Sequence, residues 1–316
     1  MELVRGIHNL KAQHQGCVLS IGNFDGIHLG HNAVLSRLLN EAKRLDVPAT
    51  VMTFEPQPEE LFLGNHAPAR LSRLRDKFVQ LEKLKLDRLL CVSFTRQFAN
   101  ISAEIFIEEL LINKLNVKFL VIGDDFHFGY QRKGDFQLLK EAGEKHGFDV
   151  VDTQSLLQQS QRISSTRIRN ALAKGELDCA AEMLGRKYSI TGRVGHGRKL
   201  GRTIGVPTAN LFLKRRVSPV SGVFVVTISG INNNIYQGVA NIGTRPTVEG
   251  ERQQLEVHVF DFEGNLYGEQ LEVILEKKLR GEVKFDSFTE LKNQIDKDIQ
   301  DAKLWHENAS IKTINN

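Results

Sequence analysis

The first half of the chain alternates short β-rich runs with helical patterns, and no other feature of the sequence constrains the fold as strongly. The runs CVLSIGNF, ATVMTF, RLLCVSF, KFLVIG and FDVVDT are almost continuously apolar, as in strands buried on both faces of a parallel sheet. Between them, segments 31–45 and 72–86 repeat apolar residues at the spacing of one helix face. Repeated βαβ units predict a doubly wound, Rossmann-like α/β sheet that binds ligands at the carboxyl ends of its strands.

The pattern changes after Asp152. Residues 163–186 predict two short helices that close the α/β half, the first with Ser164 or Ser165 as its N-cap. From Lys187 on, short strands and glycine-rich turn signals predict an antiparallel barrel or sandwich. A final helix is predicted to begin with a capping box at Ser287 and Glu290. We therefore expect two domains, residues 1–186 and residues 187–316.

Bulk composition excludes some classes of protein. The three cysteines, Cys17, Cys91 and Cys179, are odd in number and far apart, which argues against a disulfide framework or a zinc site. No apolar run approaches the roughly 20 residues that span a bilayer, and the first ten residues lack a signal peptide's apolar stretch. The net charge of +4 fits small anionic ligands as well as nucleic acid. We expect a cytoplasmic enzyme or binding protein with no membrane partner, and the oligomeric state stays open.

Two histidines three residues apart mark the change from the first strand to the first helix. In FDGIHLGH, His28 and His31 share the first helical turn, and Gly30 lets a ligand approach the backbone. A helix N-terminus attracts anions, so two imidazoles on that face suit a triphosphate. The alternative is that His28 is an ordinary loop residue and His31 an ordinary helix-cap residue.

Two further stretches suit phosphates. GDDFHFG, residues 123–129, follows the fourth run at its carboxyl end. ISSTRIR, residues 163–169, opens a helix with hydroxyl groups from Ser164, Ser165 and Thr166 and guanidinium groups from Arg167 and Arg169. Each stretch alone could be an ordinary turn or cap, but three such features on one sheet favour a nucleotide site.

In this order, GNFDGIHLGH, GDDFHFG and ISSTRIR resemble the adenylyltransferase half of the bacterial bifunctional riboflavin kinase and FAD synthetase family. The resemblance implies that His28 and His31 bind and stabilise the reacting phosphates of ATP. It further implies a nucleotide pocket formed by Asn23, Phe24, Asp25 and Gly30, nucleotide or flavin contacts at Asp125, and a phosphate-binding segment containing Ser165, Thr166 and the catalytic Arg167. His127 stands where the family often has arginine.

The second half opens with a basic, glycine-rich stretch, residues 185–202, that contains no acidic residue. Glycines interleave with its arginines and lysines, so a loop that folds around phosphates is favoured over an RNA-binding patch. GVPTAN then supplies Thr208 and Asn210, two neutral oxygen ligands on one side of an extended chain. They suit Mg²⁺ that arrives already bound to ATP, although a simple turn fixed by Pro207 has the same spacing.

A candidate base lies in QQLEVHVFDF. Alternation along this strand places Glu256 on one face with His258, Phe260 and Phe262, and Leu255 and Val257 on the other. Apolar neighbours would raise the pKa of the Glu256 carboxyl, which could then take a proton from a primary hydroxyl group. The alternative is that Glu256 pairs with an arginine at the rim.

The second half resembles the riboflavin kinase half of the same family, through GRKLGRTIGVPTANL, SGVFVV, GVANIGTRPTV, LEVHVFDF, LYG and LRGEVKF. That resemblance implies a six-stranded antiparallel β-barrel with a C-terminal helix. Thr208 and Asn210 become ligands of Mg²⁺ and ATP, and Glu256 becomes the catalytic base. Gly195, His196 and Gly197 fall in the loop over the ATP phosphates, and Arg280 lies near the flavin.

We therefore predict two reactions with ATP, riboflavin and FMN as substrates and with Mg²⁺ as cofactor: phosphorylation of riboflavin, then adenylylation of FMN to FAD. One alternative is a nucleotidyltransferase with a single activity on another phosphate acceptor, in which the barrel selects the substrate. Another is an RNA-binding relative of aminoacyl-tRNA synthetases, which ISSTRIR disfavours because it replaces their lysine-containing loop. We expect no nucleic-acid partner.

Overall fold

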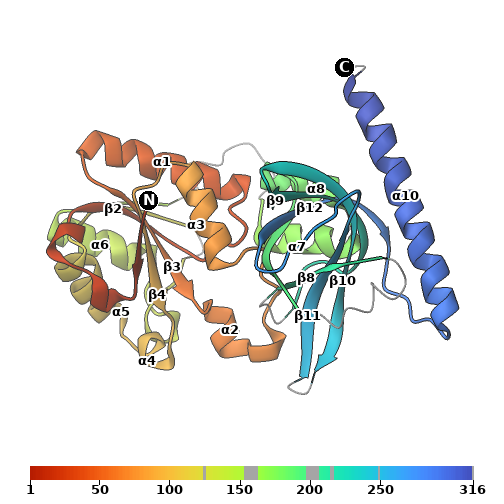
Figure 1. Cartoon of the computed structure of the whole chain (residues 1–316). Coiled ribbons are helices and arrows are strands. Elements are labelled where there is room, and N and C mark those ends of the chain that lie inside the picture. The colour runs from red at the N-terminus through yellow and green to blue at the C-terminus, as the bar shows by residue number, and fades with distance from the viewer. Residues whose placement is uncertain (124–125, 153–162, 197–205, 214–216, 248–249, 315–316) are drawn as a thin grey trace. The chain divides into compact units, whose positions relative to one another are not determined.

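The computed structural model describes residues 1–123, 126–152, 163–196, 206–213, 217–247 and 250–314 (Figure 1). The chain separates into two compact units, one formed by residues 1–68 and 72–165 and the other by residues 69–71 and 166–316. Both predicted architectures are confirmed: a parallel sheet first and a closed antiparallel barrel second.

The first unit is a six-stranded parallel sheet with the strand order β1-β4-β3-β2-β5-β6. Because the chain first adds β3 and β4 on one side of β2 and then β5 and β6 on the other, the order reverses between β2 and β5, where ligands bind in sheets of this type. Its elements in chain order are β1 (Glu2–Arg5), η1 (Ile7–Asn9), η2 (Ala12–His14), β2 (Cys17–Ile21), α1 (Leu29–Leu45), β3 (Ala49–Glu55), α2 (Pro58–Leu63), η3 (Gly64–His66), α3 (Leu74–Lys83), β4 (Arg88–Ser93), α4 (Arg96–Ala99), α5 (Ala103–Ile105), η4 (Phe106–Lys114), β5 (Val117–Ile122), η5 (Tyr130–Arg132), α6 (Phe136–His146) and β6 (Asp149–Asp152).

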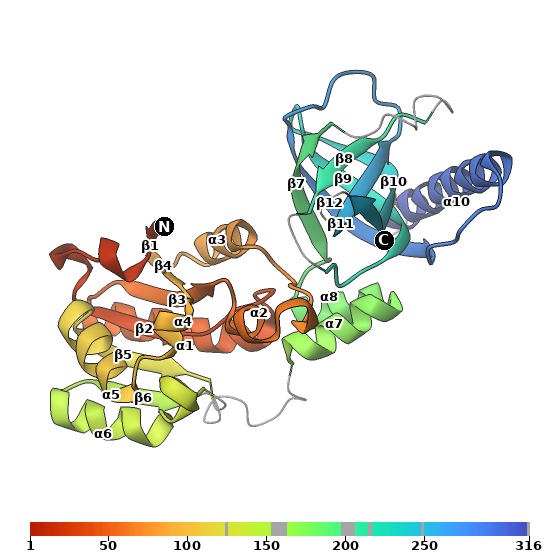
Figure 2. The ribbon, with the colours of Figure 1, turned by 90° about the horizontal axis from the view of Figure 1, so that it is seen from below.

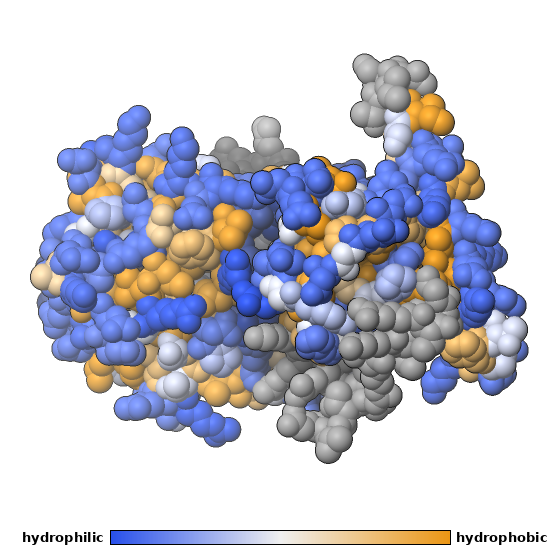
Figure 3. Space-filling model, in the orientation of Figure 1, coloured by the Kyte–Doolittle hydropathy of each residue, from blue (hydrophilic) through white to orange (hydrophobic). Residues whose placement is uncertain are grey.

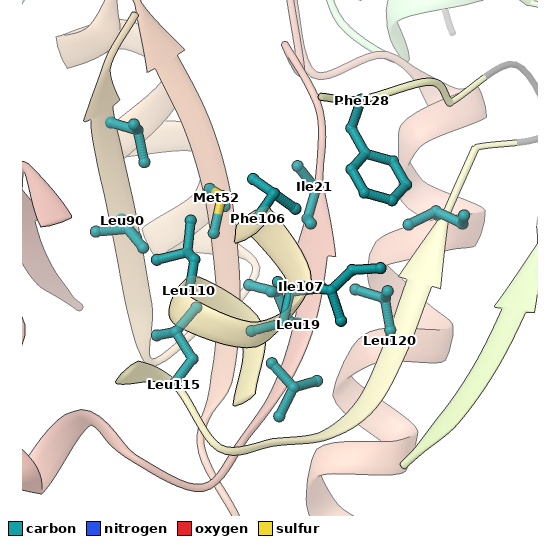
Figure 4. Close-up of a cluster of buried hydrophobic side chains, with 14 of the residues drawn as sticks. Leu19, Ile21, Met52, Leu90, Phe106, Ile107, Leu110, Leu115, Leu120 and Phe128 are labelled. Carbon is teal, nitrogen blue, oxygen red and sulfur yellow. The ribbon is translucent and has the colours of Figure 1, made fainter. Parts of the chain in front are cut away.

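Both faces of this sheet are buried, which explains its continuous apolar runs. Along β2, Cys17, Leu19 and Ile21 pack under η4 and α6, whereas Val18 packs on the other face beneath α1 and α3. Figure 4 shows the first cluster, in which side chains of β2, β3, β4 and β5 point toward the apolar side of η4.

Some elements were not predicted from the sequence. Strand β1 pairs in parallel with β4, and Glu2 lies opposite Arg88. The strand is only four residues long, and two of its residues are charged. Helix η4 has wide, π-type turns and directly continues α5. Such short or irregular elements carry little periodic signal.

The second unit is a closed barrel with the strand order β10-β11-β8-β7-β12-β9, followed by one long helix (Figure 2). Its elements in chain order are α7 (Ser165–Lys174), α8 (Leu177–Leu184), β7 (Ser189–Gly195), β8 (Ala209–Phe212), β9 (Gly222–Ile231), β10 (Asn234–Thr247), β11 (Gly250–Val259), β12 (Gln270–Arg280) and α10 (Phe288–Ile314).

Helix α10 covers the outside of the barrel wall along β9 and β10 (Figure 2). Ala302 is fully buried there in a cluster with Val223, Val225 and Phe260. The predicted N-cap is confirmed, because the Glu290 N–H donates to Ser287 Oγ at 3.2 Å. The Glu290 carboxylate accepts from the Asp286 N–H at 3.3 Å instead of the Ser287 N–H that a capping box uses. On the face in view in Figure 3, mostly hydrophilic residues cover the surface.

Three residues from early in the chain, 69–71, group with the barrel unit. Arg169 Nε in α7 donates to the Ala69 carbonyl at 2.6 Å, and the buried Tyr188 hydroxyl donates to the Leu71 carbonyl at 3.1 Å. The functional boundary that we place after Arg186 stays a prediction. None of the helices in the described part of the chain has an apolar run that could span a bilayer.

Candidate active sites

The first candidate site lies between β2 and α1, where the sequence analysis places it. His28 is the N-cap of α1 and His31 is its third residue. The His31 N–H donates to His28 Nδ1, and the His28 N–H donates to His31 Nδ1, both at 3.3 Å. Because each Nδ1 accepts a hydrogen bond, the proton of each neutral ring lies on Nε2. Both rings can therefore act as Nε2–H donors toward a phosphate.

The two imidazole rings are stacked, with centroids 3.7 Å apart and an interplanar angle of 15°. Burial lowers the pKa of His31 well below its ordinary value, and repulsion from the Lys77 ammonium, and from the His28 ring whenever that ring is protonated, lowers it further. His31 is therefore a neutral donor at neutral pH. Phe24 packs against the same ring, with a centroid distance of 5.1 Å.

The turn before the histidines is held by a residue that the sequence analysis did not single out. Ser72 N–H donates to Asp25 Oδ1 at 3.0 Å, the Ser72 hydroxyl donates to the same oxygen at 3.3 Å, and the Gly26 N–H donates to Ser72 Oγ at 2.9 Å. Asp25 is only 2% exposed. Buried Asp25 therefore fixes the turn through Ser72.

The first residues of the ISSTRIR segment contact this turn. Ser165 Oγ donates to the Asp25 carbonyl at 3.0 Å. A Cβ on Gly30 would lie 3.1 Å from both the Ile163 carbonyl and the His28 ring. Glycine at position 30 therefore lets the segment before α7 approach the histidines. That Gly30 also lets a ligand approach the backbone stays a prediction.

The remaining predicted residues of the first half are placed as follows. The Asn23 carbonyl accepts from Lys77 Nζ at 2.6 Å and from Thr53 Oγ1 at 3.2 Å, and Asn23 Oδ1 is buried without a hydrogen-bond partner among the described residues. Thr166 and Arg167 are exposed on the first turn of α7 and group with the barrel unit. Asp125 lies outside the described residues, and His127 is exposed.

The second candidate site lies on the barrel wall. Glu256 of β11 lies directly opposite Asn210 of β8 on one side and Asn241 of β10 on the other, and Asn210 lies opposite Gly195 of β7. Directly opposed residues share a face of the sheet, so Asn210, Glu256 and Asn241 form one polar row. Leu255 and Val257 are fully buried on the other face, which confirms the predicted alternation.

The amide of Asn210 is oriented by its neighbours. Gln254 Nε2 donates to Asn210 Oδ1, and Asn210 Nδ2 donates to the Thr208 carbonyl at 3.3 Å. Gln254 and Asn210 are each 7% exposed. Gln254 was not predicted as a site residue, although alternation along β11 places it on the same face as Glu256. Asn241 was also missed.

His258 fixes the segment before β8, because one of its ring nitrogens lies 2.8 Å from the Pro207 carbonyl oxygen. Its ring also packs against Phe260 at a centroid distance of 5.6 Å. Glu256 thus shares its face with aromatic neighbours, and one of its carboxylate oxygens, Oε1, is buried. That the pKa of Glu256 is raised stays a prediction.

Other predicted residues of the barrel have structural partners. Arg280 Nε lies 3.0 Å from Asp298 Oδ1 and its second terminal nitrogen 2.7 Å from Asp298 Oδ2, so it binds α10 through a two-pronged ion pair. Its guanidinium carbon lies 5.7 Å from the centre of the Phe285 ring. The exposed His196 ring lies 4.1 Å from that of Tyr267. Gly197 lies outside the described residues.

No group of three or more His, Cys, Asp or Glu side chains in the described part of the chain could hold a metal ion. Thr208 and Asn210 offer a hydroxyl and an amide oxygen instead. With few protein ligands, this donor set fits Mg²⁺ that brings substrate phosphates and water as its other ligands.

Known families match both halves of the chain. A family model described as FAD synthetase matches residues 10–167, and one described as riboflavin kinase matches residues 184–306. A solved structure titled "Crystal Structure of Macrolide-efflux Protein from Streptococcus pneumoniae" has a TM-score of 0.77 at 30% sequence identity, covering 94% of this chain and 97% of that one.

Relatives match over nearly the full length. The bifunctional riboflavin kinase/FMN adenylyltransferase of Haemophilus influenzae is 52% identical over 305 residues, 96% of this chain and 99% of that protein. The protein of the same name from Escherichia coli K12 is 54% identical over 299 residues, 94% of this chain and 96% of that protein. Two family models in tandem and relatives of this identity and coverage show that the chain belongs to the bifunctional riboflavin kinase/FMN adenylyltransferase family.

Proposed function

We propose that the barrel phosphorylates riboflavin with ATP to give FMN, and that the sheet unit transfers the adenylyl group of a second ATP to FMN, giving FAD and pyrophosphate. Membership of the family supports both activities. One observation supports the assignment of residues to the two activities: within each matched segment, the motif residues lie close together. His28 and His31 form one stacked pair, and Asn210 and Glu256 face each other on adjacent strands.

In the adenylyl transfer, a phosphate oxygen of FMN attacks the α-phosphorus of ATP, the bond to the β-phosphate bridging oxygen breaks, and pyrophosphate leaves with that electron pair. Negative charge builds up on the phosphoryl oxygens, so the enzyme contributes mainly positioning and hydrogen-bond donors. The Nε2–H groups of His28 and His31 supply such donors at the N-terminus of α1, with no proton transfer required.

The surrounding residues shape this pocket. The ring of Phe24 and the buried carboxylate of Asp25 order the turn, and Ser165 joins that turn to the start of α7. Asn23 and Gly30 contribute to the nucleotide pocket, and Asp125 contacts the nucleotide or the flavin. Thr166 and Arg167 bind the phosphate oxygens of the nucleotide. The exposed side chains of Thr166 and Arg167 support this role.

In the kinase reaction, Glu256 takes the proton of the riboflavin 5′-hydroxyl, whose oxygen attacks the γ-phosphorus of ATP while ADP leaves. The buried carboxylate oxygen and the aromatic neighbours of Glu256 support its role as the base. Gly195, His196 and Gly197 cover the ATP phosphates, and Arg280, anchored by Asp298, borders the flavin.

Thr208 and Asn210 would hold Mg²⁺ in the barrel, where it would supply positive charge to the ATP phosphates. An amide binds a cation only through its oxygen, so the orientation of Asn210 matters. Gln254 and the Thr208 carbonyl together distinguish the oxygen of that amide from its nitrogen. We therefore assign Gln254 the task of orienting Asn210.

Incubation with riboflavin, ATP and Mg²⁺, followed by chromatographic separation of the flavins, tests both activities. We expect FMN to form first and FAD to follow with release of pyrophosphate. Pyrophosphate release without any flavin would support a nucleotidyltransferase acting on another acceptor. Failure to convert riboflavin would contradict the assignment of the barrel. The match of a riboflavin kinase model to residues 184–306 disfavours an RNA-binding role for the basic loop.

A further inference from the structure

Lys77 is a buried lysine close to the histidine pair. It lies on α3, is only 1% exposed, and is the largest of the fully buried side chains in the described part of the chain. Lysine is rarely buried to this extent, because removing an ammonium group from water costs several kcal/mol. The burial of Lys77 therefore indicates that its charge or its hydrogen bonds have a specific role.

The ammonium group contacts the turn that carries the histidines. Lys77 Nζ donates to the main-chain carbonyl of Asn23 at 2.6 Å, a short, charge-assisted hydrogen bond that joins positions 54 residues apart in the sequence. Thr53 Oγ1 donates to the same carbonyl at 3.2 Å. Two side chains from different elements thus hold one carbonyl group.

The turn needs such support. Phe24 and Ile27, which follow Asn23, have φ angles of 45° and 41°. Residues with a side chain rarely adopt this left-handed region, which is strained unless the surroundings hold it. The strained turn leads directly to His28, so its shape sets where both imidazoles point.

The charge of Lys77 also reaches the histidines. Burial is the main cause of the lowered pKa of His31, and repulsion between a proton on that ring and the Lys77 ammonium adds to it. The fixed cation therefore helps to keep the His31 ring neutral. The turn also contains Asp25, whose Oδ1 accepts two hydrogen bonds from Ser72.

We propose that Lys77 is a positioning residue for FMN adenylylation: its ammonium holds the Asn23 carbonyl, and through it the turn that presents His28 and His31 to the phosphates. The inference rests on the proposed function of the histidine pair. It assigns Lys77 no contact with substrate, so its removal should reduce turnover more than it changes the KM for ATP.

The test uses full-length Lys77→Met, which removes the charge and the donor, and Lys77→Gln, which keeps an N–H donor but no charge. Lys83→Met, an exposed lysine at the end of the same helix, is the matched control. The readouts are kcat and KM for FMN adenylylation, riboflavin phosphorylation on the same molecule, and the NMR titration of the His31 ring.

We expect Lys77→Met to lower the kcat of FAD formation by about 10- to 100-fold, since a small misplacement of catalytic groups can have an effect of this size. Riboflavin phosphorylation should stay within about twofold of wild type, and the His31 titration should move upward in pH in both variants. Partial recovery of kcat in Lys77→Gln would assign the main effect to the hydrogen bond. Should Lys77→Met fail to fold, Lys77→Gln alone decides.

A folded variant with wild-type kcat and an unshifted His31 titration would overturn the proposal, as would an equal effect of Lys83→Met. Loss of riboflavin phosphorylation together with FAD formation would indicate a general structural role and would also overturn it. The proposed function fails separately, if wild-type protein makes no FAD from FMN and ATP.

Discussion

His28 and His31 cap each other: each main-chain N–H faces the Nδ1 of the other residue at 3.3 Å, and the two rings stack with centroids 3.7 Å apart. The same two hydrogen bonds that begin α1 thus fix the tautomer of both rings. The same hydrogen bonds cap the helix and leave an Nε2–H donor on each ring. A change at either histidine therefore affects both the cap and the donors.

Replacement of His31 by alanine should reduce FMN adenylylation without affecting riboflavin phosphorylation. Loss of one donor to the transition state typically costs about 2.7–4 kcal/mol, which corresponds to roughly 10²- to 10³-fold in kcat. Separate assays of FAD from FMN and of FMN from riboflavin check this. His146→Ala, at an exposed histidine at the end of α6, is the control. Equal loss of both activities would contradict the assignment.

Replacement of Glu256 by glutamine should have the opposite effect. Glutamine keeps the shape but takes no proton, so FMN formation should fall by about 10²- to 10⁴-fold. FMN supplied directly should still become FAD at the wild-type rate. Glu263→Gln, at an exposed glutamate beyond β11, controls for the loss of one charge. Full kinase activity in Glu256→Gln would exclude Glu256 as the base.

Gln254→Ala should raise the KM for Mg²⁺-bound ATP in the kinase reaction, because the Asn210 amide loses the donor that orients its oxygen. One hydrogen bond of about 0.5–1.5 kcal/mol corresponds to a change of about 2- to 13-fold. Gln253→Ala is a matched control, because Gln253 precedes it on the strand and donates to Thr244 Oγ1 instead. An effect of the same size in both variants would refute an orienting role for Gln254.

The lowered pKa of His31 predicts a pH dependence of stability. Below about pH 6.5 the unfolded chain binds a proton at His31 that the native protein does not, so the free energy of unfolding should fall as the pH falls from there toward the native pKa. The slope from this group is at most about 1.4 kcal/mol per pH unit. Urea unfolding of wild type and His31→Gln at several pH values measures the difference. Parallel curves would contradict a lowered pKa.

The sequence predicts those parts of the fold and site that depend on local pattern. The histidine pair at a strand-to-helix junction follows from residues three apart, and the row of Asn210 and Glu256 agrees with the alternation of strands. Continuous apolar runs predict a sheet buried on both faces, which the packing of β2 confirms.

The sequence does not reveal the residues that support these sites from a distance. Ser72 is 47 positions from Asp25, Lys77 is 54 from Asn23 and Gln254 is 44 from Asn210. Serine, lysine and glutamine are common on surfaces, so their types gave no reason to expect burial. Only the tertiary fold brings them to their partners.

The attachment of residues 69–71 to the barrel unit bears on how this protein can be dissected. A fragment truncated before α7 would retain Ala69 and Leu71 but not Arg169 and Tyr188, the donors to their carbonyl groups. Ser72, the next residue, orders Asp25, so the truncation would also disturb the turn that leads to the histidine pair. An excised N-terminal half that proved inactive would therefore be weak evidence that the barrel takes part in the chemistry.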